Sequence, residues 1–365
     1  MRLVVTLLFF LMTLPASAQW WSVQTSGMDT NLRGVSVTRL RGGRDEYIVW
    51  AAGSNGTILR SVDNGKNWER LTIPDARDLD FRDIQGFDGD KDTAYAMSSG
   101  DGEKSRVYKT SDGGKTWQLQ YSDKRTGFFL DALACDSKAH CVVLSDPIEG
   151  KFVVIATNDG RHWSELSRDK IPVALPKEGA FAASGTSIAL CSPNAILFAT
   201  GGASVARVFR SLDGGRSWKA IETPVAAGGP TSGIFGIACE GSLVVAVGGD
   251  YKNADSSKQV AAFSEDLGET WQLADSQPGG YRSAVGNFGP GSLVAVGPNG
   301  TDIGKRQSKG EMRWQPSDKL NLNAVGFAGT EGWAVGPSGT IARFKAHSGL
   351  GEKDREPVKR PSAKN

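Results

Sequence analysis

The chain has 365 residues, 46 of them glycine, and its apolar residues fall in short runs rather than in long helical periods. It has four cysteines, three histidines and no Cys-x-x-Cys sequence, so neither a metal site nor a cofactor is expected. The formal net charge is +2; Arg2 contributes one positive charge and residues 346–365 contribute two more. The rest of the chain is close to −1, which argues against the basic stripe of a nucleic-acid-binding domain.

The first eighteen residues have the pattern of a secretory signal. Arg2 gives a positive start, Leu3 to Leu14 form a short apolar core, and Ala16-Ser17-Ala18 provides small residues before a cut at Gln19. This apolar run is shorter than the about 20 residues of a transmembrane helix, so no membrane span is expected. We therefore expect residues 1–18 to be a signal peptide and the mature protein to be periplasmic or secreted.

Short apolar runs follow, grouped as in small sheets. In the first group they cover residues 34–38, 47–53, 57–61 and 68–71. Runs of about five residues that alternate or stay apolar are typical of half-buried strands. The pairs Asn55-Gly56 and Asn299-Gly300 indicate hairpin turns. Each group is therefore predicted to be one sheet of four strands.

An octet, Ser-x-Asp-x-Gly-x-x-Trp, recurs before the last strand of these groups and is the Asp-box or BNR repeat. Its clean copies carry the pairs Asp63 and Trp68, Asp112 and Trp117, Asp213 and Trp218, and Asp266 and Trp271. An aspartate there can accept hydrogen bonds from backbone amides, a glycine supplies a left-handed turn, and a tryptophan packs between sheets. We expect a structural staple rather than a catalytic or calcium-binding aspartate.

Two weaker copies continue the series. One ends at Trp163, with Asn158 in the aspartate place and Gly160 in the glycine place, and a degenerate one ends at Trp314. Successive box tryptophans are 43 to 55 residues apart, which fits a four-stranded propeller blade of about 40–50 residues.

The last group covers residues 322–327, 332–336 and 340–344 and has no tryptophan strand after it. The missing strand stands at the other end, where residues 19–23 include Trp21, 47 residues ahead of Trp68. Closing the last blade with the first strand removes two open sheet edges. The prediction is an all-β, seven-bladed β-propeller over residues 19–345, whose blades have four strands. Six or eight blades would require one miscounted group.

The cysteines fall into two pairs. Cys135 and Cys141 bracket a turn between adjacent strands, so a local disulfide is expected in an oxidising compartment. Cys191 and Cys239 lie late in the first strands of successive blades, where a bridge and two buried free thiols are both open alternatives.

Residues 346–365 combine glycine, proline, serine and mixed charge, a composition typical of a disordered tail. We expect the folded part to be a monomer.

The boxes and units such as Gly332-Trp333-Ala334-Val335-Gly336 resemble the photosystem II stability/assembly factor-like propellers, a BNR-repeat group, over about residues 19–345. Members in photosynthetic organisms assist photosystem II assembly by binding a newly made subunit. The resemblance implies the propeller fold and a protein or peptide partner. One fold hosts many functions, so it implies the task less strongly than the fold.

Sialidases and xyloglucan hydrolases also carry Asp-boxes. A sialidase would carry an Arg-Ile-Pro sequence near its start, and this chain has none. The xyloglucan hydrolases resemble two propellers that face each other, and this chain is long enough for only one. An enzyme is therefore not the leading hypothesis. The alternative is a carbohydrate-active enzyme, a glycoside hydrolase or lyase, with carbohydrate as its ligand.

The loops that enter first strands, and those that join second and third strands, are expected at the channel mouth opposite the Asp-boxes. The candidate binding residues in those loops are Arg33, Arg82, Asp131, Asp146, Glu178, Asp250, Tyr251, Tyr281 and Arg282.

Three interpretations of these residues are open. Arginines can hold a carboxylate bidentately, and the tyrosines can stack on a sugar or peptide side chain. The charged groups can instead pair with one another and seal the mouth. In the enzyme alternative, two carboxylates among Asp131, Asp146, Glu178 and Asp250 act on a glycosidic bond, and their separation would decide.

Overall fold

Short apolar runs separated by tight turns form seven sheets of four antiparallel strands each in the described part of the chain. The computed structural model describes residues 20–40 and 46–345. The predicted signal peptide and tail therefore lie outside the described residues. Each sheet is one blade, numbered in chain order from the sheet that contains β2.

Three blades come from the first half of the chain. Blade 1 contains β2 (Leu32–Arg39), β3 (Tyr47–Gly53), β4 (Thr57–Ser61) and β5 (Glu69–Leu71). Blade 2 contains β6 (Asp80–Phe87), β7 (Asp90–Ser99), the short 3-10 helix η1 (Gly102–Lys104), β8 (Arg106–Thr110) and β9 (Gln118–Ser122). Blade 3 contains β10 (Leu130–Cys135), β11 (Cys141–Ile148), β12 (Lys151–Thr157) and β13 (Ser164–Glu165).

Four blades complete the set. Blade 4 contains β14 (Ile188–Ser192), β15 (Ala195–Ala199), β16 (Ala206–Ser211) and β17 (Lys219–Thr223). Blade 5 contains β18 (Ser232–Glu240), β19 (Leu243–Asp250), β20 (Ala261–Ser264) and β21 (Gln272–Leu273). Blade 6 contains β22 (Ala284–Gly289), β23 (Ser292–Gly297), β24 (Gly300–Ser308) and β25 (Glu311–Asp318). Blade 7 contains β26 (Ala324–Ala328), β27 (Glu331–Val335), β28 (Thr340–Phe344) and β1 (Trp21–Thr25).

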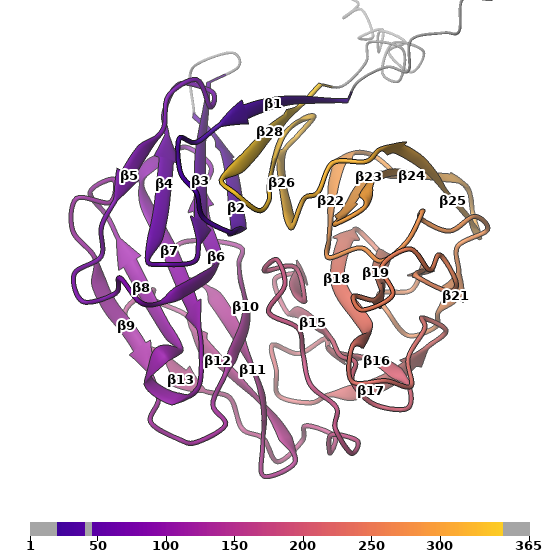
Figure 1. Ribbon diagram of the computed structural model, residues 1–365. Coiled ribbons are helices and arrows are strands. Elements are labelled where there is room, and N and C mark those ends of the chain that lie inside the picture. Colours follow the sequence, from indigo (N-terminus) through magenta and orange to yellow (C-terminus); the bar gives the residue numbers. More distant parts are fainter. Residues whose placement is uncertain (1–19, 41–45, 346–365) are drawn as a thin grey trace, which may run out of the picture.

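The blades follow one another around a common axis, with the first strand of each blade innermost (Figure 1). The outermost strand of blade 7 is β1, which runs antiparallel to β28 with Trp21 opposite Phe344 and Thr25 opposite Thr340. The amide of Lys345 also donates to the carbonyl of Trp20 at 2.7 Å. The prediction of a seven-bladed propeller closed by the N-terminal strand is confirmed.

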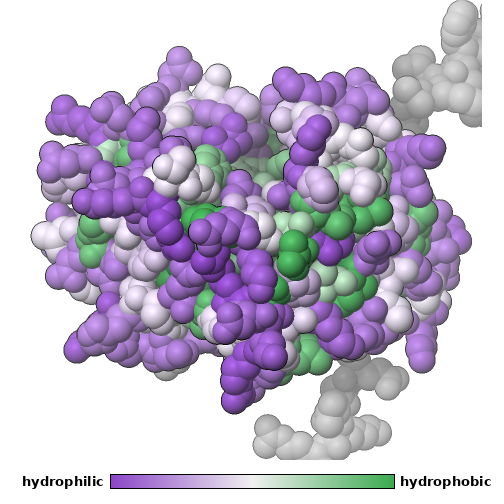
Figure 2. All heavy atoms as spheres, turned by 90° about the horizontal axis from the view of Figure 1, so that it is seen from below, coloured by the Kyte–Doolittle hydropathy of each residue, from purple (hydrophilic) through white to green (hydrophobic). Residues whose placement is uncertain are grey.

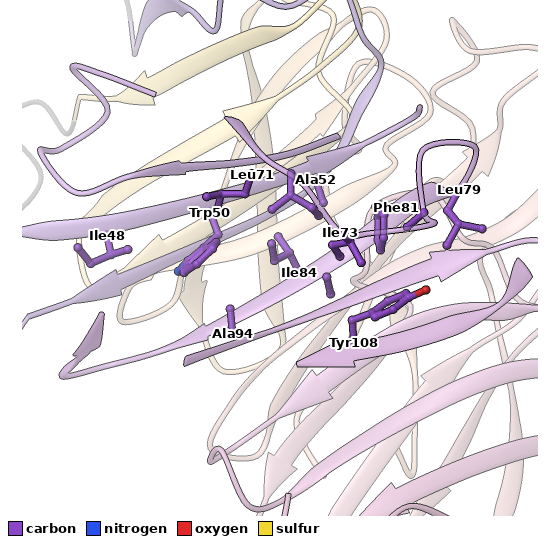
Figure 3. Close-up of a cluster of buried hydrophobic side chains, with 13 residues drawn as sticks. Ile48, Trp50, Ala52, Leu71, Ile73, Leu79, Phe81, Ile84, Ala94 and Tyr108 are labelled. Atoms are coloured by element: carbon purple, nitrogen blue, oxygen red, sulfur yellow. The ribbon is translucent and has the colours of Figure 1, made fainter. Parts of the chain in front are cut away.

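Apolar side chains fill the space between neighbouring blades. Between blades 1 and 2, Trp50 of β3 lies close to Ile84 of β6, and both are buried (Figure 3). Trp117, the box tryptophan of blade 2, meets Trp50 edge-to-face with 6.3 Å between ring centroids. A buried side chain of this size contributes about 1.5–3 kcal/mol, so such clusters hold the ring of blades together.

The clean Asp-boxes have the predicted staple geometry. Asp63 Oδ1 accepts from the amide of Asn67 at 2.9 Å, and the indole N–H of Trp68 donates to the carbonyl of Gly65 at 3.1 Å. In the fourth blade, hydrogen bonds from the Ser217 hydroxyl and amide lower the pKa of Asp213 to about 2. The equivalent indole bonds of Trp117, Trp218 and Trp271 are 3.0 to 3.1 Å long.

The weaker boxes differ, and one prediction is wrong. In blade 3 the aspartate of the box is Asp159, not Asn158, because Asp159 Oδ1 accepts from the amides of Arg161 and His162. This box is one residue shorter than the others, and the indole N–H of Trp163 has no partner in the described residues. In blade 6 a long β24–β25 hairpin replaces the box, and Trp314 lies over Gly304.

Both cysteine pairs are disulfide-bonded. Cys135–Cys141 joins β10 to β11 with an S–S distance of 2.03 Å, which confirms the expected local bridge. Cys191 and Cys239, 5.3 Å apart between Cα atoms, join β14 of blade 4 to β18 of blade 5. Of the two alternatives that the sequence left open for this pair, the structure has the disulfide and not two free thiols.

Hydrophilic residues dominate the face seen in Figure 2, and hydrophobic residues show only in small groups between them. Among the described residues, no helix is both long and apolar enough to cross a bilayer.

Candidate binding site at the channel mouth

Strand direction brings most of the predicted residues to one rim of the ring. Arg33, Arg82 and Asp131 stand near the starts of β2, β6 and β10, the innermost strands of three successive blades. Asp146 and Asp250 lie near the ends of the second strands β11 and β19. In antiparallel sheets these positions share a side, and the Asp-box turns lie on the opposite side.

Two arginines at this rim differ in their partners. Arg82 donates from Nε to Asp80 Oδ2 at 2.8 Å and from Nη1 to the carbonyl of Ala182 at 2.9 Å. Arg33 forms no salt bridge within the described residues; with the Asn31 amide turned toward it, Nη2 donates to that amide oxygen at 3.0 Å. Burial, and then the charge of Arg82, lower the pKa of Arg33. Asp80, which is paired with Arg82, and Tyr281 act on the pKa of Arg33 in the opposite direction.

Two aspartates behind the arginines are mostly buried. Asp131 is 1% exposed, and its Oδ2 has no hydrogen-bond partner in the described residues. Burial and the neighbouring Asp146 raise the pKa of Asp131 well above its ordinary value. Asp146 Oδ1 accepts from the amide of Ala180 at 2.9 Å, and burial raises the pKa of Asp146 to about 6. The pair thus carries less negative charge than two exposed aspartates, which leaves the rim more positive.

An aromatic cluster adjoins Arg33. Phe181 stacks on Phe235 with 3.8 Å between centroids, and Tyr281 meets Phe235 edge-on at 4.7 Å. Tyr281 is buried and lies within electrostatic range of Arg33. Tyr251 lies 6.4 Å from Tyr281 and is 44% exposed. Of the two predicted tyrosines, Tyr251 is the one that presents its ring to solvent.

Two other predicted residues, Glu178 and Arg282, have their polar atoms engaged within the fold. Glu178 is buried and accepts from Thr200 Oγ1 at 2.6 Å and from Arg207 Nε at 2.9 Å. Arg282 is 2% exposed and pairs with Asp302. These contacts fit the alternative in which charges seal the mouth.

Asp250 is less buried than Glu178 and Arg282, and its carboxylate has no cationic partner among the described residues. Its Oδ1 accepts from the Thr231 hydroxyl at 2.7 Å and from the amide of Lys252 at 2.9 Å. The structure therefore does not bring Asp250 together with Asp131 and Asp146 as a set of free carboxylates.

The sequence reasoning missed the partners Arg207 and Asp302. Both lie in third strands, β16 and β24; Arg207 stands between buried neighbours, and Asp302 between buried Thr301 and partly buried Ile303. A charged residue that interrupts a buried strand was the available signal, since such a charge is rarely left without a partner.

The connection between blades 3 and 4 crosses the channel. We call residues 179–187 the cross-channel segment. Beyond its contacts with Asp146 and Arg82, the Ser184 hydroxyl donates to the carbonyl of Ser283 at 2.7 Å. The amide of Ile237 donates to the carbonyl of Thr186 at 2.8 Å. The segment thus contacts blades 2, 3, 5 and 6 and closes the channel beneath the mouth.

No family model matches the chain, and no curated protein matches it. Among solved structures, YCF48 bound to D1 peptide is 16% identical at a TM-score of 0.61, covering 91% of this chain and 99% of that chain. YCF48 from Cyanidioschyzon merolae is 15% identical at a TM-score of 0.62, covering 89% and 98%.

Virginiamycin B lyase from Staphylococcus aureus is 14% identical at a TM-score of 0.56, covering 90% of this chain and 100% of that chain. The same architecture thus carries a peptide complex in one protein and a lyase in another. At these identities the likeness extends to the fold alone. The chain is similar in fold to YCF48, which confirms at that level the resemblance to photosystem II assembly factor-like propellers.

Proposed function

We propose that this protein is an exported propeller that binds a protein or peptide partner at the channel mouth, in the manner of an assembly or stability factor. The observation that carries the proposal is Arg33, a partly buried guanidinium without an ion-pair partner in the described residues, beside Arg82. Buried cations usually have a counter-charge. The nearby Asp80 is already paired with Arg82, so a ligand carboxylate is a fitting partner for Arg33.

The surroundings support a peptide as that ligand. Arg82 is held by Asp80 through Nε and Nη2 and by the carbonyl of Ala182 through Nη1, so it adds positive charge beside Arg33. The exposed ring of Tyr251 and the half-buried ring of Phe181 offer apolar area for a neighbouring side chain. Interface anchors are commonly aromatic residues and arginines of this kind.

The carbohydrate-active alternative has less support. A glycosidase needs two carboxylates that reach an open pocket. Glu178 is tied to Arg207, and Asp131 is almost without exposed area. Asp250 is held by the Thr231 hydroxyl and the amide of Lys252, and the structure does not bring it together with Asp146 as a pair of free carboxylates.

The test is a quantitative pull-down from the native periplasm with the wild-type protein and an Arg33→Ala/Arg82→Ala variant. The matched control is Arg161→Ala, because Arg161 is exposed in the box turn of blade 3 on the opposite rim. We expect partners that the wild type and the control recover equally and the double variant loses. Equal recovery by all three proteins would overturn the proposal.

Export has a separate test. Both disulfides support an oxidising compartment. Mass spectrometry of the mature protein from fractionated cells should find its first residue at Gln19 in the periplasmic or secreted fraction. An intact N-terminus in the cytosolic fraction would refute this part.

A further inference from the structure

A cavity of about 260 Å³ lies on the propeller axis, on the far side of the cross-channel segment from Arg33. The inner strands of blades 1 to 5 and 7 contribute to its wall. Its inner end is formed by Asp83 and Gly185, and Cys135, Leu190 and Phe327, from the late parts of inner strands, lie toward the Asp-box side. The cross-channel segment therefore turns the channel into a blind pocket.

The walls of this pocket are mixed: Val37, Leu133, Ile188 and Ile237 contribute apolar side chains, and Ser36, Gln85, Ser184 and Thr186 contribute polar ones. Asp83 is the one charged side chain among the described lining residues, and it is 6% exposed. Pockets for small molecules typically combine an apolar lining with a few polar groups that fix orientation.

Asp83 has amide donors but no cation. Its Oδ1 accepts from the amide of Ile84 and its Oδ2 from the amide of Leu133, each at 2.8 Å. Gly185 lies directly over the carboxylate, since a Cβ there would be 2.4 Å from its carbon. Burial raises the pKa of Asp83 to about 7, because no positive charge compensates the ionised form.

A second acceptor lines the same pocket. Gln85 donates from Nε2 to the carbonyl of Gly86 at 2.9 Å, and its Oε1 accepts no hydrogen bond from the described residues. A carboxylate and a free amide oxygen together call for a ligand rich in donors. An ammonium group has three N–H donors and a positive charge.

We propose that this blind pocket binds a small organic ammonium ion, with its nitrogen against Asp83 and Gln85 and its hydrocarbon part along the side chains of Leu133, Ile188 and Ile237. A structural role for Asp83, linking blade 2 to blade 3 through Leu133, explains the two amide bonds. It does not explain the Gln85 side-chain oxygen, which accepts no hydrogen bond from the described residues. The proposal is independent of the arginine rim on the other side of the segment.

The test is isothermal titration calorimetry of the full mature protein at pH 8 with three probes of similar shape. These are phenethylamine, the neutral 2-phenylethanol and the anionic phenylacetate. We expect phenethylamine to bind with one site, and the alcohol and the acid to bind at least about tenfold more weakly. Comparable affinity for the alcohol, or no binding of the amine at millimolar concentrations, would overturn the proposal.

Two variants locate the site. Asp83→Asn should weaken amine binding at least about tenfold and leave alcohol binding unchanged. Leu190→Trp should block the pocket without touching Asp83, and Leu119→Trp, at a 51% exposed position of β9, is its control. If Asp83→Asn fails to fold, Leu190→Trp still decides: unchanged amine affinity in that variant refutes the pocket.

The pH dependence gives an independent readout. The described lining holds no lysine, arginine, histidine or glutamate, and Cys135 is in a disulfide, so Asp83 is its one titrating group. Amine affinity should rise as the pH rises through about 7. A flat profile between pH 6 and pH 8 would contradict an ion pair with Asp83.

Discussion

The indole N–H of Trp21 donates to Oγ1 of Thr301 at 3.1 Å, although 280 positions separate the two residues. Trp21 belongs to the closing strand of blade 7, whereas Thr301 lies in β24 of blade 6. The Trp21 ring also packs against Phe344, 5.2 Å away between centroids. The N-terminal strand is thus fastened to two blades, not merely laid along the edge of one.

Replacing Trp21 should therefore loosen the ring closure. Trp21 is 1% exposed, and Trp21→Ala should lower the free energy of unfolding by about 3–5 kcal/mol, measured by urea denaturation. The control is Val23→Ala on the same strand, where the side chain is 54% exposed and the change should stay within about 0.5 kcal/mol. Equal losses for the two variants would contradict a closure held by packing.

Gly185 should tolerate no side chain, because its place over Asp83 leaves no room. Its φ is +79°, and Gly127, with φ of +80° and no atom within 4 Å of an added Cβ, is a matched control. Gly127→Ala should cost about 1–2 kcal/mol of unfolding free energy from backbone strain alone. Gly185→Ala should cost clearly more, and equal costs in thermal denaturation would refute the close approach.

The two disulfides should differ in their effect on stability. In the chain-entropy description a longer closed loop stabilises more, and the sequence separations are 48 for Cys191–Cys239 and 6 for Cys135–Cys141. Replacing both cysteines by serine should lower the free energy of unfolding by about 4 kcal/mol for the long loop and about 2 kcal/mol for the short one. Urea denaturation of the two double variants checks the order, and a reversed order would contradict it.

Glu178 should prove structural. Its side chain is fully buried against Arg207, and removing one partner of such a pair leaves an uncompensated charge. Glu178→Ala should lower the free energy of unfolding by about 3–5 kcal/mol. Glu311→Ala breaks the exposed pair with Arg313 and should cost less than about 1 kcal/mol. A stable Glu178→Gln variant that loses a sugar-releasing activity would instead favour the enzyme alternative.

Stability should fall as the pH rises from about 4 to about 7. Native Asp83 keeps its proton up to about pH 7, whereas the unfolded chain releases it near pH 3.9, so the native state binds more protons in this window. Asp146, with its pKa raised to about 6, acts in the same direction. Asp83→Asn should flatten the dependence of the urea midpoint on pH, and an unchanged slope would refute a buried, protonated Asp83.

The fold could be predicted from the sequence because each residue type of the repeat has one structural role. The spacing of Trp68, Trp117 and the later box tryptophans marks the blades, and Trp21 one period earlier marks the closure. The aspartate of the blade 3 box was misassigned to Asn158 because that turn is one residue short, which shifts the octet. Local patterns failed only where the local geometry changed.

The candidate site was less predictable. The rim on which Arg33 and Arg82 lie follows from strand direction. The pairing of the charged residues does not follow from strand direction. Glu178 pairs with Arg207, 29 residues away, because of the path that the intervening loop takes. The crossing of the channel by residues 179–187 had one visible signal, the 55-residue spacing between Trp163 and Trp218, the longest in the series. Spacing alone does not tell whether extra residues turn outward or inward.

The pairing of β1 with β28 also determines the order in which the blades can be completed during synthesis. Six sectors can organise as they leave the ribosome, but the seventh waits for residues near position 344 to meet a strand made more than 300 residues earlier. Until then the N-terminal strand β1 has no partner and can pair with strands of other chains. A chain that ends before β28 therefore leaves the ring open and the edge of β1 without its partner.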